Sequence, residues 1–231
     1  MTYQWLKPHA LSSTAWLMYR SMMGIGLVCG MIILFVYQWT APIIQKNRSA
    51  LLEQAIFQVL PQAKSKLAFY QSSTGQFLPV TDESAGESII YASYGAQSNF
   101  MGLVIAAQGM GYQDRIALLY AYIPQRQRIV GLQILDSRET PGLGARIRSD
   151  PDFLANFVNL DVQLSDDQTS FVHPLQVVKA GQKKHPWQID SMSGATVSSQ
   201  AVADMVRLSA EQWIPLLSQH REDFEVGKQT D

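Results

Sequence analysis

A long apolar segment near the N-terminus dominates the hydropathy pattern of the chain. Residues 21–44 read SMMGIGLVCGMIILFVYQWTAPII and carry no charge. At about 24 residues, the segment is long enough to cross a bilayer with some tilt. Arg20 precedes it, and Tyr37 and Trp39 suit a membrane interface. We therefore predict a short N-terminal tail over residues 1–20, followed by one retained transmembrane helix.

Two other structures could produce this apolar segment. A signal peptide would have a shorter apolar core and a small-residue cleavage site, and the bulky sequence QWTAPIIQ is a poor one. A buried core helix rarely runs this long without a polar face. The charges do not decide the orientation, because Lys7 and Arg20 precede the span while Lys46 and Arg48 follow it.

After the span, the spacing of apolar residues predicts first a helix and then a series of strands. Residues 47–60 have apolar positions at three- and four-residue intervals, which predicts a helix ending at Pro61, within a connecting segment 45–64. Strand-like runs then dominate, and PQRQ between two of them predicts a hairpin. The expected strands are 66–70, 88–94, 101–109, 115–123, 128–136, 175–180 and 187–190.

Helical patterns return in the second half of the chain. A short helix is expected within 151–160, and a longer one from about Ser198. The apolar stripe expected for the longer helix comprises Val197, Ala201, Val202, Met205, Val206 and Leu208. Strands flanked by helices indicate an α+β domain with a mainly antiparallel sheet over 65–218, and the polar tail 219–231 is expected to fray.

Composition excludes several classes of function. The chain has 231 residues, of which 47% are hydrophobic and 16% charged, and its net charge of −1 gives no general footprint for nucleic acid. The single cysteine, Cys29, lies in the apolar segment, so neither an intramolecular disulfide nor a cysteine-bound iron–sulfur cluster is expected. The four histidines are too widely spaced to form a helical metal-binding pair.

Two segments carry candidate chemistry. Residues 190–200, DSMSGATVSSQ, are mostly small and lead into the predicted helix, where free backbone N–H groups attract a phosphate. A serine-rich helix cap without a ligand would explain the same residues. Residues 139–146, ETPGLGAR, follow a strong strand and read as a turn, either functional or purely structural.

These two segments together resemble the FMN-binding domain family. SGAT at 193–196, with Asp190 before it and Ser198 after it, is similar to the flavinylation motif of that family, and ETPGLG at 139–144 is similar to its other recurrent segment. Their order after one N-terminal span resembles the G subunits of Rnf-type ion-translocating electron-transport complexes. The C subunits of sodium-pumping NADH:quinone reductases are the near alternative.

The resemblance implies a function and a set of site residues. Thr196 would bear FMN through a phosphoester made by a separate flavin transferase from FAD. The domain would lie on the periplasmic side of the bacterial inner membrane, with the other complex subunits as partners. The other residues expected to bind the cofactor are Ser193, Gly194, Ala195, Val197, Ser198, Glu139, Thr140, Leu143 and Gly144.

A relay is a better description of this chemistry than a stand-alone catalyst, because no general base or nucleophile constellation for substrate turnover is evident. A tether would also hold the flavin at high effective concentration. The competing hypothesis from another class is a membrane-anchored binding or scaffold module without flavin. Detection of a covalent flavin on Thr196 would distinguish these possibilities.

Overall fold

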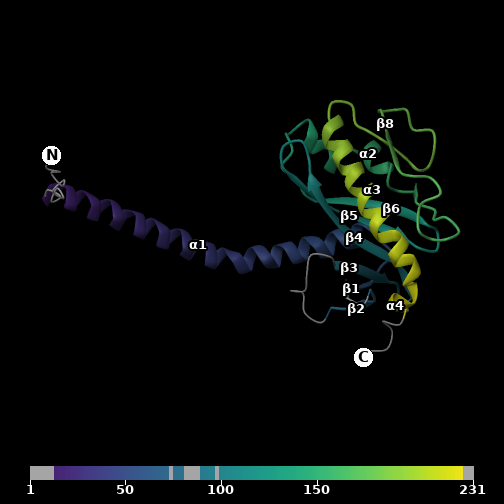
Figure 1. The fold of residues 1–231 in the computed structure, drawn as a ribbon, viewed down its shortest axis with the longest axis horizontal. Helices are drawn as coiled ribbons and strands as arrows, with labels where there is room; N and C mark the ends of the chain where they lie inside the picture. The colour runs from purple at the N-terminus through teal and green to yellow at the C-terminus, as the bar shows by residue number, and fades with distance from the viewer. Residues whose placement is uncertain (1–12, 73–74, 81–88, 97–98, 226–231) are drawn as a thin grey trace, which may run out of the picture. The chain divides into compact units, whose positions relative to one another are not determined.

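The computed structural model describes residues 13–72, 75–80, 89–96 and 99–225 (Figure 1). Contacts divide the chain into two compact units, Met1–Ala50 and Leu51–Asp231. Most of the predicted N-terminal tail, and the last six residues of the predicted C-terminal tail, lie outside the described residues.

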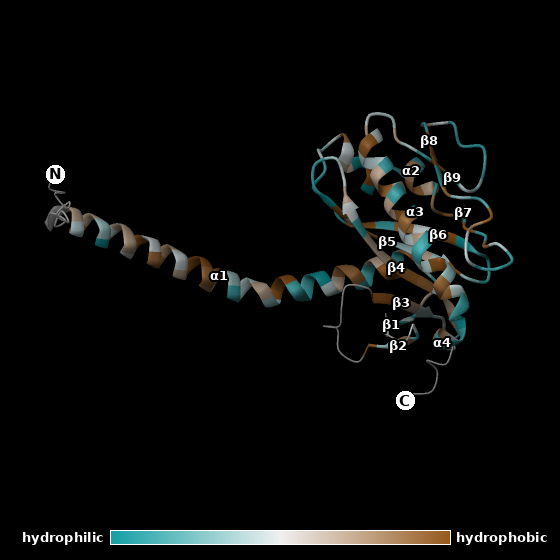
Figure 2. Ribbon diagram, viewed as in Figure 1, coloured by the Kyte–Doolittle hydropathy of each residue, from teal (hydrophilic) through white to brown (hydrophobic). Residues whose placement is uncertain are grey.

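One continuous helix, α1 (Ser13–Val59), contains both the predicted span and the predicted connecting helix. It is long and apolar enough to cross a membrane, and none of its most apolar window is buried within the protein. Hydrophobic residues recur along its length (Figure 2). The predicted connecting helix is therefore the C-terminal part of α1, and its residues from Leu51 onward belong to the second unit.

A mainly antiparallel sheet forms the second unit, as the sequence predicts. Among the described residues its strand order is β2-β1-β3-β4-β5-β6-β7, and every neighbouring pair is antiparallel. The strands are β1 (Ser65–Gln71), β2 (Phe77–Pro79), β3 (Ile89–Tyr94), β4 (Phe100–Met110), β5 (Arg115–Ile123), β6 (Arg128–Asp136) and β7 (Leu160–Asp161).

Both faces of the sheet are covered, which explains the nearly continuous apolar character of β5. Successive side chains of a strand point to opposite faces. Tyr120 and its alternate neighbours pack in the core beneath helix α3 (Thr196–Gln219), whereas Leu119 and Ala121 pack against residues 55–63, the last turn of α1 and the residues just after it. Figure 1 shows α3 lying across the sheet.

Shorter elements connect β6 to α3. They are the 3-10 helix η1 (Gly144–Arg148), α2 (Pro151–Ala155), and a separate parallel pair formed by β8 (Gln176–Val178) and β9 (Gln188–Asp190). The predicted short helix is confirmed as α2, followed by the buried Phe157. Because β9 runs directly into the loop before α3, it positions the first candidate segment.

The apolar stripe of α3 differs from the predicted one at two positions. Val197 and Leu208 are exposed, because the helix begins at Thr196 and turns a different face to the sheet. The buried residues of the helix include Val202, Ala203, Met205, Val206, Ala210, Ile214 and Leu217.

The tail does not fray throughout, so the prediction for 219–231 is wrong for its first part. Residues Arg221–Glu225 form helix α4, and Phe224 is completely buried. Its ring lies 5.0 Å from the ring of Phe69 and 5.1 Å from that of Phe77, measured between centroids. Burial of this one aromatic side chain therefore anchors the otherwise polar helix α4 to the core.

Candidate functional site

Thr196 is the first residue of α3 and its side chain is exposed. The loop Ser191–Ala195 joins β9 to this helix, with Ser193 and Gly194 exposed and Ala195 buried. Gly194 has a φ of 81°, a conformation that residues with a Cβ rarely adopt. The small residues of the motif thus turn the chain sharply and leave the threonine hydroxyl accessible.

Ser199 fixes the shape of this loop from inside the helix. Its hydroxyl accepts a hydrogen bond from the backbone N–H of Met192 at 2.9 Å and donates to the carbonyl of Thr196 at 3.0 Å. The carbonyl of Met192 in turn accepts from the N–H of Ala195 and from the Thr196 hydroxyl, both at 3.2 Å. The hydroxyl is therefore oriented without being buried.

The start of α3 suits an anion. Ala195 is the N-cap residue, and no capping hydrogen bond from its side chain is possible. The first backbone N–H groups of a helix have no partner within the helix, and the helix dipole gives this end a partial positive charge. A phosphate attached to Thr196 would find donors at this end.

Asp190, which precedes the motif, supports the backbone on the opposite side of the loop. Its Oδ1 accepts from the backbone N–H groups of Gln182 and Lys183, at 3.0 and 2.9 Å. Burial lowers the pKa of Lys183, an effect that the nearby Asp190 opposes, and the Lys183 ammonium donates to Oδ1 of Asn156 at 3.2 Å. The carboxylate of Asp190 thus holds the turn that leads into β9.

The second candidate segment meets the first through Glu139. This side chain is 5% exposed, and its Oε2 accepts a hydrogen bond of 2.6 Å from the hydroxyl of Ser198. Its Oε1 accepts from the backbone N–H of Gln113, in the turn between β4 and β5, at 3.0 Å. Glu139 and Ser198 are 59 residues apart in the sequence, and their contact makes the two motif segments adjacent in the fold.

The predicted site residues form an exposed group and a buried group, with Thr140 between them. Leu143 and Val197 are 54% and 53% exposed, and Thr140 is half-buried, with its hydroxyl donating to Oε1 of Gln113 at 3.1 Å. The exposed residues are Ser193, Gly194, Thr196, Val197 and Leu143; the buried ones are Ala195, Ser198, Glu139 and Gly144. The exposed group can contact a ligand, and the buried group shapes the surface that presents it.

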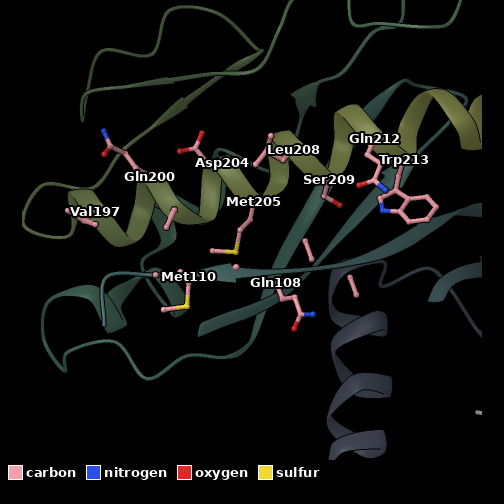
Figure 3. A pocket seen from close by; sticks show the side chains of 15 residues that line it. Gln108, Met110, Val197, Gln200, Asp204, Met205, Leu208, Ser209, Gln212 and Trp213 are labelled. Carbon is pink, nitrogen blue, oxygen red and sulfur yellow. The ribbon is translucent and has the colours of Figure 1, made fainter. Parts of the chain in front are cut away.

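A groove of about 650 Å³ begins beside the motif, between β4 and α3 (Figure 3). Val197, Gln200 and Met110 lie toward its near end, Met205 and Leu208 line its middle, and Trp213 lies at its far end. A second cavity of about 640 Å³ lies on the other side of the loop, lined by Ser193 together with Arg146, Asp150, Asn156 and Asp190.

Gln113 is the site residue that sequence reasoning missed. It lies in a turn of four polar or flexible residues, GYQD at 111–114, whose composition indicates only a strand connection. Its side-chain Oε1 accepts from Thr140, but its contact with Glu139 uses the backbone N–H, a group that every residue except proline carries. The side-chain types along the chain therefore gave no signal for this contact.

Comparison with known proteins finds similarity over the region that contains both motif segments. Residues 111–211, which contain both motif segments, match the family model described as FMN-binding domain. The chain is 29% identical over 191 residues to the G subunit of the ion-translocating oxidoreductase complex of Methanosarcina acetivorans, covering 83% of this chain and 90% of that protein.

Two further similarities concern a shorter region and the fold. Over 121 residues the chain is 32% identical to the G subunit of the proton-translocating ferredoxin:NAD(+) oxidoreductase complex of Clostridium ljungdahlii, covering 52% of this chain and 58% of that protein. The crystal structure of Shewanella oneidensis NqrC has the same fold, with a TM-score of 0.56 and 18% identity, covering 71% of this chain and 87% of that structure.

Proposed function

We propose that this chain carries FMN covalently on Thr196 and relays electrons within a membrane-bound, ion-translocating oxidoreductase complex, a proposal supported by the match of residues 111–211 to the FMN-binding domain model. The observation that carries the proposal is the exposed Thr196 hydroxyl at the start of α3, where Ala195 provides no side-chain cap. The proposal also explains why both motif segments converge on this one place.

The residues around Thr196 fit a phosphoester. Ser193 and Gly194 leave the approach to the hydroxyl open, and the N-terminal N–H groups of α3 can donate to phosphate oxygens. Esterification would remove the hydrogen bond from Thr196 to the carbonyl of Met192. That carbonyl keeps the N–H of Ala195 as a donor, so the loop retains its internal bonding.

Attachment is a phosphoryl-group transfer performed by a separate flavin transferase with FAD as donor. The oxygen of Thr196 forms a bond to the phosphorus on the FMN side of FAD, and the pyrophosphate bond breaks. AMP leaves, and the threonine proton is released. No oxidation state changes in this transfer, and FAD is the co-reactant that supplies the FMN group.

Bound FMN would supply the capacity to accept and donate electrons, and the protein would supply its surroundings. Leu143 and Val197 are exposed apolar side chains, one from each motif segment. Thr140 presents a half-buried hydroxyl that is already oriented by Gln113. These side chains would contact the flavin, while Glu139 and Gly144 would support the loop from below.

The helix α1 and the relatives support a membrane setting for this relay. The helix is long and apolar enough to cross a membrane, and the relatives are named as G subunits of ion-translocating or proton-translocating complexes. We place the second unit on the periplasmic side of the bacterial inner membrane, with the other subunits of an Rnf-type complex as partners. Subunits that co-purify with the chain distinguish this complex from a sodium-pumping quinone reductase.

The decisive experiment is in-gel flavin fluorescence after denaturation, with the flavin transferase co-expressed. The wild-type chain should give a fluorescent band, and Thr196→Val should give none. A peptide containing Thr196 should carry the mass of FMN minus water. A wild-type chain without the band would indicate a scaffold module, and a band that persists in Thr196→Val would reject the attachment site.

Orientation requires a separate measurement. Protease added outside intact spheroplasts should digest the second unit, whereas the same protease added to inverted vesicles should leave it intact. The reverse pattern would place the domain in the cytoplasm and would contradict the periplasmic assignment.

A further inference from the structure

We propose that Glu139 is a positioning residue, and that its hydrogen bond with Ser198 holds the flavin-bearing end of α3 in one fixed relation to the loop at 139–144. We call this pair of side chains the latch. The inference deepens the proposed function and rests on it, because the latch matters for electron transfer only if Thr196 carries the cofactor.

The latch joins three segments that are distant in sequence. Glu139 follows β6, Ser198 lies in the first turn of α3, and Gln113 lies between β4 and β5. Both oxygens of the carboxylate are used, one by the Ser198 hydroxyl at 2.6 Å and one by the Gln113 N–H at 3.0 Å. A single buried side chain therefore fixes the positions of all three.

The packing around Glu139 leaves space for this side chain and little else. A Cβ on Gly144 would lie 2.6 Å from Oε2 of Glu139 and 2.6 Å from the hydroxyl oxygen of Ser198. A Cβ on Gly111 would collide with Oε1 of Glu139. Glycine at both positions therefore allows the backbone to approach the carboxylate from two sides.

The two side chains of the latch belong to segments that lie beside the attachment residue. Ser198 is two residues after Thr196 in the same helical turn, and Glu139 begins the loop that exposes Leu143. The Ser198 hydroxyl and Oε2 of Glu139 are 2.6 Å apart, which is short for a hydrogen bond between two oxygen atoms. Breaking this bond frees the loop and the helix start to move relative to each other, which changes the surroundings of a tethered ring.

Three substitutions separate the geometry from the charge. Ser198→Ala removes the latch and leaves the bond between Glu139 and Gln113. Glu139→Ala removes both bonds. Glu139→Gln removes the charge but can keep both bonds, since the amide oxygen accepts from Gln113 while the amide nitrogen donates to the Ser198 hydroxyl.

Ser209→Ala is the matched control. It makes the same chemical change in the same helix, and it breaks a hydrogen bond of comparable length, the 2.9 Å bond between the hydroxyls of Ser209 and Tyr120. A general loss of stability in α3 would affect this variant as well. Only the loss of the latch should affect the flavin.

The readouts are the fluorescence anisotropy and the visible circular dichroism of the flavin in the full-length, flavin-loaded chain. Ser198→Ala and Glu139→Ala should lower the anisotropy and weaken the dichroic bands. Glu139→Gln and Ser209→Ala should match the wild type. Unchanged signals in Ser198→Ala, or an equal loss in Ser209→Ala, would overturn the proposal.

Covalent loading is measured first on each sample by in-gel fluorescence, which keeps the two proposals separate. A wild-type chain without covalent flavin rejects the proposed function itself. A loaded wild type with equally loaded variants and identical flavin spectra rejects only the latch. Loss of loading in Ser198→Ala would also overturn the latch, because the exposed Thr196 should remain accessible to the transferase.

Discussion

The hydroxyl of Ser199 and the backbone N–H of Met192 are joined by a buried hydrogen bond of 2.9 Å that closes the loop carrying the attachment residue. The same hydroxyl donates back to the carbonyl of Thr196. One serine therefore fixes both the residue before the motif turn and the first residue of α3.

Replacing Ser199 with alanine should destabilise the second unit by about 1–3 kcal/mol, because the N–H of Met192 loses its partner while buried. Urea unfolding followed by circular dichroism measures the difference. Ser193→Ala changes an exposed hydroxyl of the same loop and should stay within about 0.5 kcal/mol of the wild type. Equal effects for the two variants would contradict the assigned role of Ser199.

Thr196→Val should leave the unflavinylated chain as stable as the wild type, to within about 0.5 kcal/mol. The residue is exposed, and its hydroxyl makes one hydrogen bond, of 3.2 Å, to a carbonyl that has a second donor. Thermal unfolding of both chains, expressed without the transferase, measures this. A large loss of stability would mean that the threonine serves the fold.

Asp150 gives α2 a pH-dependent contribution to stability. The N–H of Phe153 donates to its carboxylate, which holds the pKa below the ordinary value of 3.8, and Arg146 adds a second donor at 2.6 Å. The folded-state pKa is the lower one, so the contribution is present above pH 3.8 and is lost as the pH falls.

Asp150→Ala should therefore cost about 1 kcal/mol at neutral pH, as the loss of a helix cap does. The difference from the wild type should shrink below pH 3.8. Urea unfolding at a series of pH values tests this. Asp152→Ala, which removes an exposed carboxylate two residues away, serves as the control and should show a smaller and flatter difference.

Tyr94 should give the opposite pH dependence. Its hydroxyl donates to the carbonyl of Phe224 at 2.7 Å, and burial raises its pKa from 10.0 to about 12. Between these values the unfolded chain releases the proton while the folded chain keeps it, so stability falls as the pH rises.

Tyr94→Phe should cost about 1–3 kcal/mol at neutral pH, since the carbonyl of Phe224 loses its donor. The advantage of the wild type should decline as the pH rises from 10.0 toward 12. Unfolding titrations of both chains across this range give the result. A difference that stayed constant with pH would show that folding does not raise the pKa of the Tyr94 hydroxyl.

The strands were predictable where local chemistry marks both of their ends. The structure places β5 at Arg115–Ile123 and β6 at Arg128–Asp136, with the bounds expected from their aliphatic runs and the PQRQ connection. The very short strands β2 and β7 were not predicted, because two or three residues show no recognisable periodicity.

The buried face of α3 and the burial of Phe224 could not be predicted, because both depend on tertiary packing. Val197 fits a helical stripe by spacing, yet it lies in the first turn of α3 and is exposed. Phe224 is flanked in the sequence by charged residues, yet it is buried by contacts with Phe69 of β1 and Phe77 of β2. For the site, the sequence indicated the two motifs, but only the structure revealed the contact of Glu139 with Ser198.

The position of Phe224 has a consequence for biosynthesis. Neighbouring strands from β3 to β6 follow one another in the chain, so this part of the sheet can assemble while the polypeptide is still being made. The rings of Phe69, Phe77 and Phe100 contact Phe224, so they gain this partner only once α4 has been synthesised. A premature stop codon just after Gln219 would release a chain with an open aromatic cavity, prone to aggregation although every residue of both motifs had been translated.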